Sequence, residues 1–162
     1  MNSTFENKLS QIYWNRFQQF GSTPQGSFWA TEARQTRRFE IILCEIDKLS
    51  GAAGFSLADI GCGYGALVDY LLKRPASSVT SYIGYDISEQ LIAACKHKFE
   101  KPWARFICSS APDQEQDFSV MSGPFNLAAT RDLVLWQNYV FDTLQGCWSH
   151  TKVAMIFNLQ VA

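Results

Sequence analysis

The sequence predicts an α/β fold, a three-layer α/β/α sandwich with a mostly parallel sheet of about five strands that is preceded by N-terminal helices. Residues 55–162 alternate short apolar runs with segments of helical periodicity, which is typical of successive β-α-β units. Residues 1–50 carry helical periodicity alone. A cluster of glycines directly follows the first apolar run, where a strand would turn into a helix.

Length and composition limit the possible classes of protein. With 162 residues the chain is long enough for one domain with a substantial core and too short for two, so we expect a single domain over residues 1–162. Fourteen basic residues nearly balance fifteen acidic ones, so nucleic acid and membrane surfaces are not expected as partners. No apolar stretch approaches the ~18 residues of a membrane span, and residues 1–21 lack the apolar core of a signal peptide.

The cysteines favour a reducing compartment, which we take to be the cytoplasm. Their number is odd and none of them are spaced as CxxC, so neither a disulfide framework nor a metal site is expected. We interpret them as buried free thiols. They are Cys44, Cys62, Cys95, Cys108 and Cys147.

Two helices are predicted before the sheet. Apolar residues recur at steps of three and four over residues 5–20, and Gly21 ends this helix. Thr31 can cap a second helix that ends near Gly51. Three basic residues near the start of the second helix are most simply interpreted as a solvated helix face. They are Arg34, Arg37 and Arg38.

The predicted core alternates strands and helices. Ligands of such parallel sheets bind at the carboxyl ends of the strands, near the point where the strand order reverses. The glycine turn after residue 60 lies at such an end. Strands are expected at residues 56–60, 79–85, 104–108, 125–129 and 153–159, and helices at residues 66–73, 88–99 and 133–147.

The stretch LADIGCGYGALVDYL, residues 57–71, carries the first candidate site. Gly61, Gly63 and Gly65 leave the backbone bare, and the following helix presents free N–H groups and a positive dipole end. Their spacing also fits a pyrophosphate-binding turn. Asp59 disfavours that ligand, because a carboxylate at ~4 Å repels an anion by a few kcal/mol and attracts a cation. Alternatively, Asp59 only caps loop amides.

The second candidate is Asp86, at the end of the strand predicted at residues 79–85. A carboxylate at this position can accept hydrogen bonds from both hydroxyls of a ribose, which suits any ligand that contains adenosine. The alternative is a purely structural one, in which Asp86 caps the helix that begins near Ser88. The residue type alone leaves both interpretations open.

Together, LADIGCGYGALVDYL and YIGYDISEQLIAACKHKF resemble the first two motifs of class I S-adenosylmethionine-dependent methyltransferases, which have a Rossmann-like fold. The resemblance extends over residues 55–159. It implies S-adenosylmethionine as cofactor and S-adenosylhomocysteine as product. It also implies that the methionine moiety is lined by the glycine turn, that the ribose is held by an acid and that the adenine packs on an apolar side chain. These residues are Asp59, Gly61, Cys62, Gly63 and Gly65 for the methionine, Asp86 for the ribose and Ile87 for the adenine.

The same resemblance implies three further features of the site. Family members often carry an acid after the third strand that bonds the adenine, and here Ser109 and Ser110 stand in its place. Residues 21–39 look like a segment that folds over the cofactor in some members. Arg38 could then pair with the methionine carboxylate and Trp29 could wall the pocket, although plain surface charge and packing are the alternatives. The predicted fourth strand would end beside the sulfonium methyl.

The expected activity is methyl transfer to an unidentified acceptor, with no catalytic residue assigned. Methyl transfer is an in-line displacement at an activated carbon, so positioning and desolvation can suffice, and a base is needed only for a protonated nucleophile. Arg131 and Asp132 could touch the substrate, or Asp132 could place charge at a helix start. The sequence lacks the Asn/Asp-Pro-Pro-aromatic tetrad and the Pro-Cys pair of nucleic-acid methyltransferases, which favours a small molecule or a protein side chain as acceptor.

Two other functions stay open at this point. One is a non-catalytic S-adenosylmethionine-binding or interaction protein on a shortened form of the same fold. The other is a nucleotide-linked oxidoreductase. The family's sheet usually has seven strands, whereas this sequence ends after the fifth. Because an exposed apolar edge strand invites pairing, we expect a second copy to cover it and form a homodimer.

Overall fold

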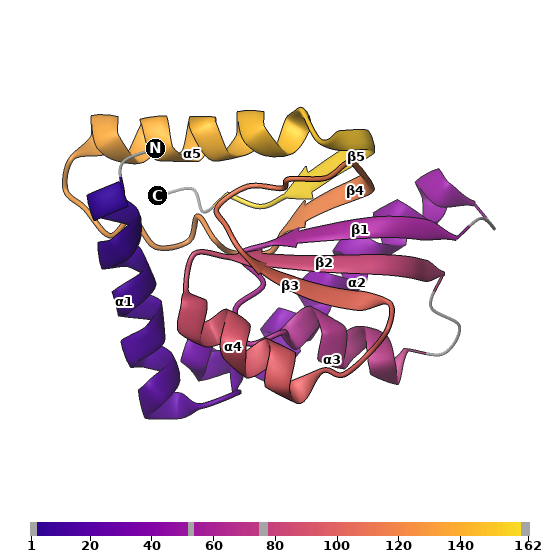
Figure 1. Cartoon of the computed structure of the whole chain (residues 1–162), viewed down its shortest axis with the longest axis horizontal. Helices are drawn as coiled ribbons and strands as arrows, with labels where there is room; N and C mark the ends of the chain where they lie inside the picture. The colour runs from indigo at the N-terminus through magenta and orange to yellow at the C-terminus, as the bar shows by residue number, and fades with distance from the viewer. Residues whose placement is uncertain (1–2, 52–53, 75–77, 160–162) are drawn as a thin grey trace.

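The computed structural model describes residues 3–51, 54–74 and 78–159, and these form a sheet of five parallel strands with helices packed on it (Figure 1). The strand order is β3-β2-β1-β4-β5. The strands are β1 (Phe55–Ile60), β2 (Val79–Asp86), β3 (Ala104–Cys108), β4 (Gln116–Met121) and β5 (Thr151–Phe157). The helices are α1 (Ser3–Phe20), the short 3-10 helix η1 (Pro24–Ser27), α2 (Glu32–Ser50), α3 (Ala66–Lys73), α4 (Glu89–Lys98) and α5 (Leu133–Trp148). The predicted fold class is confirmed.

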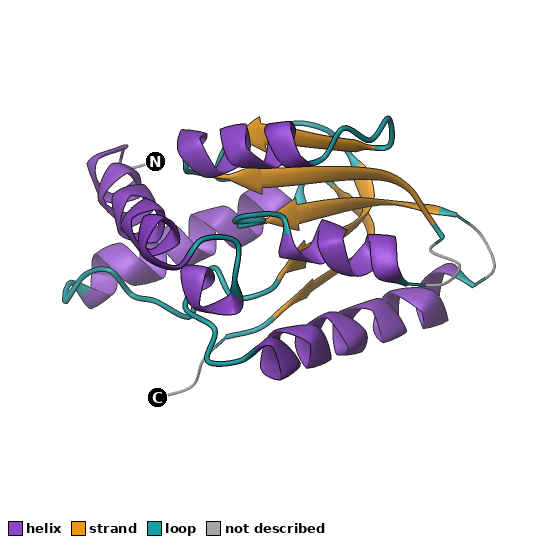
Figure 2. Ribbon diagram, turned by 90° about the horizontal axis from the view of Figure 1, so that it is seen from below, coloured by secondary structure: helices purple, strands orange, loops and turns teal. Residues whose placement is uncertain are grey.

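Each face of the sheet has its own apolar core. On one face, apolar side chains of α2, α3 and α4 pack against β1, β2 and β4. On the other face, α5 covers the sheet, and both layers are visible in Figures 1 and 2. Helix α1 lies beyond the carboxyl ends of β1 and β2 (Figure 1). There the ring of Phe5 packs edge-on against the ring of Tyr139 in α5, with 5.1 Å between the ring centroids. This arrangement closes the end of the sheet at which ligands bind.

The fourth strand is the one element that the sequence misplaced. The predicted strand at residues 125–129 is a turn and a loop, and β4 lies upstream at Gln116–Met121. Polar residues hide the apolar pattern of β4, and two of them, Asp117 and Ser119, are satisfied by partners on neighbouring strands. Asp117 accepts hydrogen bonds from the backbone N and the hydroxyl of Ser56, both at 2.8 Å. Ser119 shares a hydrogen bond of 2.6 Å with Thr151.

The remaining elements agree with their predicted positions to within two or three residues, the fifth strand being two residues earlier than expected. The interpretation of the cysteines is wrong at two positions. Cys62, Cys95 and Cys147 are buried thiols as predicted, whereas Cys44 and Cys108 are exposed. Cys44 lies outside the buried stripe of α2, and Cys108 ends the edge strand β3. None of the described helices is long and apolar enough to cross a membrane.

Candidate functional site

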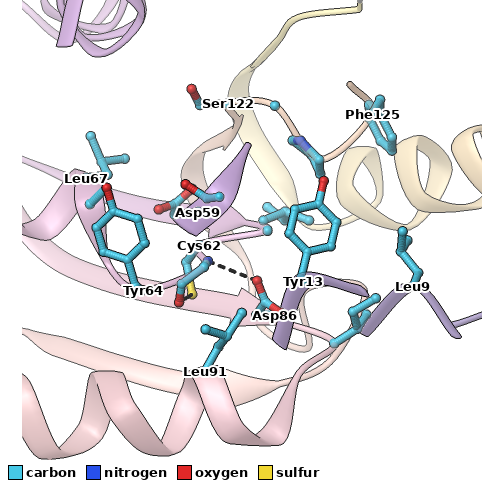
Figure 3. A pocket seen from close by; sticks show the side chains of 18 of the residues that line it. Leu9, Tyr13, Asp59, Cys62, Tyr64, Leu67, Asp86, Leu91, Ser122 and Phe125 are labelled. Atoms are coloured by element: carbon cyan, nitrogen blue, oxygen red, sulfur yellow. Dashed lines mark hydrogen bonds between the residues drawn. The ribbon is translucent and has the colours of Figure 1, made fainter. Parts of the chain in front are cut away.

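A pocket opens at the carboxyl ends of β1 and β2, next to the point between β1 and β4 where the strand order reverses. This is the place at which open parallel sheets bind their ligands. The pocket is lined by the glycine turn after β1, by the end of β2 and by the loop after β4. Side chains of α1, α2 and α5 close it. Figure 3 shows some of the lining residues, including Leu9 and Tyr13 of α1 and the two acids Asp59 and Asp86.

The glycine turn presents bare backbone to this pocket. Gly63 has φ +56°, and a Cβ added there would meet no atom within 4 Å, so any side chain at this position would occupy the open space. Its N–H donates a hydrogen bond of 2.9 Å to Asp86, drawn as a dashed line in Figure 3. Gly61 has φ +74°, and a Cβ there would meet Pro124 at 2.9 Å. Glycine is therefore required by backbone angle at both positions and by close approach at Gly61.

Gly65 has a different role from the one predicted. It does not line the pocket. It caps α3 in a left-handed conformation with φ +80°, and a Cβ there would overlap the ring of Phe99 at 2.3 Å. Gly65 thus allows α3 to begin close against Phe99 and sets the shape of the turn, without lining the pocket.

Strand register brings two carboxylates onto one side of the sheet. Asp59 pairs with Gly84 of β2, and side chains alternate along a strand, so Asp86 points to the same face two residues further on. Both side chains border the pocket and both residues are buried, at 4% and 8% exposed. Among the described residues neither carboxylate forms an ion pair with a basic side chain. The pocket therefore holds two buried acids without a basic partner, which favours a cationic or hydrogen-bond-donating ligand.

The two carboxylates are held differently. Asp59 accepts a hydrogen bond of 2.6 Å from the hydroxyl of Tyr82, and burial raises the pKa of Asp59 to about 7 despite that bond. Asp86 accepts hydrogen bonds from the backbone N–H of Gly63 and of Ser88, each at 2.9 Å. Burial raises the pKa of Asp86, and these N–H donors oppose the rise. Asp86 thus accepts a hydrogen bond from the backbone N–H of Ser88 just before α4, but the residue that caps α4 is Ser88, not Asp86.

Cys62 and Cys95 lie beneath the turn. The thiol of Cys95 donates a hydrogen bond of 3.2 Å to the carbonyl of Gly63. A hydrogen bond with Cys95, together with burial, raises the pKa of Cys62 well above its usual value. Cys62 therefore stays a neutral thiol at physiological pH and contributes a compact, weakly polar part of the wall.

Three polar residues on the helical side of the pocket are not among the site residues predicted from the sequence. Tyr13 of α1 and Tyr139 of α5 line it, and burial raises the pKa of both phenols, with the charge of Asp86 adding to the rise. Gln35 of α2 also lines the pocket and accepts a hydrogen bond of 3.0 Å from the hydroxyl of Tyr64. For Gln35 the sequence did contain a signal, because it is a polar residue on the otherwise apolar buried stripe of α2. Helical periodicity over residues 5–20 includes Tyr13 but does not show that it faces a pocket.

Most of the predicted site residues come together in this pocket. Gly65 and Arg38 do not line it. Arg38 lies beside it, with its guanidinium 5.8 Å over the ring of Trp29. Ser109 and Ser110 both line the pocket, and the hydroxyl of Ser109 donates to the carbonyl of Ala111 at 2.7 Å. The predicted residues that do line the pocket are Trp29, Asp59, Gly61, Cys62, Gly63, Asp86, Ile87 and Ser110.

The loop after β4 supplies the wall that the misplaced strand was expected to supply. Ser122, Gly123 and Phe125 line the pocket, and the hydroxyl of Ser122 is buried without a hydrogen-bond partner among the described residues. Asp132 lies outside the lining and caps α5, accepting a hydrogen bond of 3.0 Å from the backbone N–H of Leu135. The described residues contain no cluster of His, Cys, Asp and Glu that could hold a metal ion.

Comparison with known sequences identifies relatives of the core. Residues 57–153 match the family described as "Methyltransferase domain". The chain is 37% identical over 111 residues to Rv1506c of Mycobacterium tuberculosis, a protein to which methyltransferase activity is assigned provisionally. The matched region covers 68% of this chain and 66% of that protein.

Solved structures share the fold. The plantazolicin methyltransferase BpumL, in complex with a pentazolic desmethylPZN analog and S-adenosylhomocysteine, superposes with a TM-score of 0.60 at 18% identity over 91% of this chain. Magnesium protoporphyrin IX methyltransferase (ChlM) from Synechocystis PCC 6803, with bound S-adenosylhomocysteine, gives a TM-score of 0.66 at 13% identity over 97% of this chain. The superposed regions cover 55% and 71% of those proteins, so the chain spans little more than half the length of the first.

Proposed function

Since this chain belongs to the methyltransferase domain family, we propose that it binds S-adenosylmethionine in the pocket and transfers the methyl group to an acceptor. The observation that carries the proposal is the pair of buried carboxylates, Asp59 and Asp86, facing a glycine turn with no side chain in the way. S-adenosylmethionine has an ammonium and a sulfonium for the first acid and ribose hydroxyls for the second. The residues present therefore fit this ligand in charge and in shape.

We propose that the methionine moiety lies along Asp59, Gly61, Cys62 and Gly63. Two of these have no side chain to exclude it, and Asp59 supplies negative charge. Trp29 would cover the part of the pocket that holds the methionine moiety. Arg38 has less support as the partner of the methionine carboxylate, because it lies outside the lining and its guanidinium would have to leave the ring of Trp29.

The nucleoside end is proposed to lie at the end of β2. Asp86 would accept hydrogen bonds from the ribose hydroxyls while keeping its contacts with the backbone N–H groups, because each carboxylate oxygen can accept two bonds. Ile87 would pack on the adenine, and Ser110 would face its polar edge. A dinucleotide is disfavoured, because its negatively charged pyrophosphate would lie beside the carboxylate of Asp59 and be repelled by it.

The chain's own contribution to the reaction is proposed to be placement and exclusion of water. When bound, the cofactor supplies a methyl carbon activated by its sulfonium; the acceptor's nucleophile bonds to that carbon as the carbon–sulfur bond breaks, with the electron pair left on sulfur. Leu9, Tyr13 and Tyr139 would cover the pocket and keep water from the reacting atoms. Since the pKa of each tyrosine is raised, both remain neutral phenols near pH 7 and would act as hydrogen-bond donors, not as bases.

The acceptor is proposed to be a small molecule or a protein side chain. The net charge of −1 gives no broad basic surface for a nucleic-acid backbone. Calorimetric titration with S-adenosylmethionine, S-adenosylhomocysteine and NAD tests the ligand class. We expect both sulfur nucleosides to bind and NAD not to bind. Formation of S-adenosylhomocysteine with a metabolite and peptide panel then separates an enzyme from a non-catalytic binding protein.

Pairing of two copies along β5 stays a prediction. Among the described residues β5 pairs only with β4, and Val153 and Phe157 on it are 54% and 38% exposed. A free edge with exposed apolar side chains can extend its sheet with a strand of another chain. Light scattering across a concentration series measures the mass directly, and a constant monomer mass would contradict the pairing.

A further inference from the structure

A second concave surface adjoins the pocket and has the opposite electrostatic character. We name it the arginine groove and define it by the residues that line it, which are Phe28, Trp29, Ala30, Ala33, Arg34, Arg37, Arg38, Ile41, Asn126, Asn158 and Leu159. Trp29 lines both the groove and the pocket. The proposed function leaves Arg34, Arg37 and the two asparagines without a role.

The groove lies beside the pocket, at the carboxyl ends of β4 and β5. Asn126 belongs to the loop after β4 and Asn158 follows β5, so the groove flanks the carboxyl ends of both strands. The backbone N–H of Asn126 donates to the carbonyl of Gly123 at 3.1 Å, and Gly123 lines the pocket and lies against Trp29. One short loop therefore joins the two concave surfaces.

Helix α2 turns a basic face toward the groove. Arg34, Arg38 and Ile41 follow each other at helical steps of four and three residues and thus share a side of the helix. Arg37 is adjacent and pairs with Glu40 at 3.1 Å, with 72% of the arginine side chain exposed. Arg34 and Arg38 form no ion pair within the part of the chain that the structure describes. The groove therefore keeps positive charge that a ligand can use.

Two neutral features complete a recognition site. The half-buried ring of Trp29 offers a flat apolar surface beside the guanidinium of Arg38. Asn158 donates from its Nδ2 to Asn126 at 3.0 Å, while its Oδ1 is buried with no partner among the described residues. A buried acceptor without a donor is costly unless a ligand or water supplies one. Guanidinium groups bind carboxylates and phosphates in a two-pronged geometry, and planar bodies stack on indole.

From these contacts we propose that the arginine groove binds the acid group of the methyl acceptor, a small planar molecule that carries a carboxylate or phosphate on an aromatic or conjugated body. Arg34, which has no ion pair among the described residues, holds the acid together with Arg37, which exchanges its exposed pair with Glu40 for the ligand. Trp29 packs on the planar body, and the nucleophilic end points past Gly123 into the pocket. The inference rests on the proposed function, since it assigns the groove to the acceptor of that reaction. A nucleic acid is disfavoured, because three arginines span too little of a phosphate backbone.

The test compares paired ligands on the full chain saturated with S-adenosylhomocysteine. The probes are 4-hydroxybenzoate, its neutral amide 4-hydroxybenzamide, phenyl phosphate and phenol, with binding measured by calorimetry and saturation-transfer NMR. We expect at least one of the two anions to bind about tenfold more tightly than its neutral counterpart. The double variant Arg34→Gln/Arg37→Gln should abolish this preference, and Arg105→Gln, an exposed arginine on the far edge strand, should keep it.

Cofactor affinity keeps the two proposals distinguishable. The double variant should bind S-adenosylhomocysteine within about twofold of the original chain, which also shows that it is folded. If the cofactor does not bind the original chain at all, the proposed function fails. If the cofactor binds but no anion of the set is preferred over its neutral counterpart, or the preference survives in the double variant, the groove proposal is overturned. A short single-stranded oligonucleotide that binds more tightly than every small anion overturns it as well.

Discussion

The pocket and the arginine groove share the ring of Trp29 and carry opposite charge, and they are built by different means. The acids of the pocket sit at strand ends, where sheet register places both; backbone N–H groups hold Asp86 and the hydroxyl of Tyr82 holds Asp59. The basic groups of the groove sit on the outer side of one helix and are largely exposed. A buried site tolerates little change, whereas exposed side chains can be exchanged without disturbing the fold. We therefore expect the pocket to be conserved in chemistry and the groove to set selectivity.

The largest expected effect is at the glycine turn. In Gly63→Val the new side chain fills open pocket space, so affinity for S-adenosylmethionine should fall by more than about 100-fold. A positive φ also strains any non-glycine residue by ~1–2 kcal/mol. Gly51→Val is a matched control, because Gly51 has φ +62°, has no atom within 4 Å of an added Cβ and lies at the far end of α2. Equal loss of affinity in both variants would show that strain, not occupancy of the pocket, is responsible.

The next effect concerns Asp86. Asp86→Asn removes the charge that strengthens hydrogen bonds to the ribose and to Gly63, and charged hydrogen bonds contribute about 1.5–3 kcal/mol. Calorimetry should show affinity for S-adenosylhomocysteine reduced by about 10- to 100-fold. Asp113→Asn is the control, since Asp113 accepts a hydrogen bond of 2.8 Å from Tyr85 and lies outside the pocket lining. A similar reduction in both variants would contradict the assignment of Asp86.

Asp59 makes both binding and stability depend on pH, in opposite directions. Its pKa is about 7 in the folded chain and near 4 when unfolded, so the folded state holds an extra proton between these values. The free energy of unfolding should therefore fall as pH rises from about 4 to about 7. Urea unfolding at pH 5 and pH 8 measures this difference, which should be smaller in Asp59→Asn. An identical difference in the variant would exclude Asp59 as its source.

Cofactor binding should respond to the same proton in the other sense. A cationic ligand favours the ionised form of Asp59, so affinity for S-adenosylmethionine should rise between pH 5.5 and pH 7.5, by at most about tenfold per pH unit. Asp59→Asn should bind more weakly and lose most of this dependence. Titrations in two buffers of different ionisation enthalpy would detect the released proton. A flat affinity profile in the original chain would separate Asp59 from the ligand's charge.

The smallest expected effect concerns Arg38, and it tests whether this residue contributes to cofactor binding in the pocket or only to the arginine groove. Its guanidinium lies over that ring and outside the pocket lining. If it turns to the methionine carboxylate, Arg38→Gln should weaken binding of S-adenosylhomocysteine by about threefold, a modest loss because the partner is partly solvated. Adenosine, which lacks the carboxylate, should bind both forms equally. Unchanged affinity for S-adenosylhomocysteine would place Arg38 in the groove alone.

The sequence was informative where local chemistry is specified by backbone geometry. The glycines, Asp59 and Asp86 were identified because turn and strand-end positions demand particular residue types. Prediction failed where polar residues lie in a buried strand and find their hydrogen-bond partners on elements that are distant in the sequence. Asp117 and Ser119 hid β4 because their partners, Ser56 and Thr151, come from distant strands. Tyr13 was not predicted as a site residue, because periodicity shows that a helix face is apolar without showing what lies opposite it.

The sequence by itself determined the alternation of strands and helices, the parallel sheet and the acid-flanked glycine turn, because these depend on spacing along the chain and on the backbone angles that each residue type permits. Only the tertiary structure decided which helices close the pocket, that Gly65 packs on Phe99 and does not line the pocket, and that Trp29 lies between an acidic pocket and a basic groove. Those features join segments such as α1, α2 and the loop after β4. Their proximity follows from the packing of whole elements, which no local pattern of residues encodes.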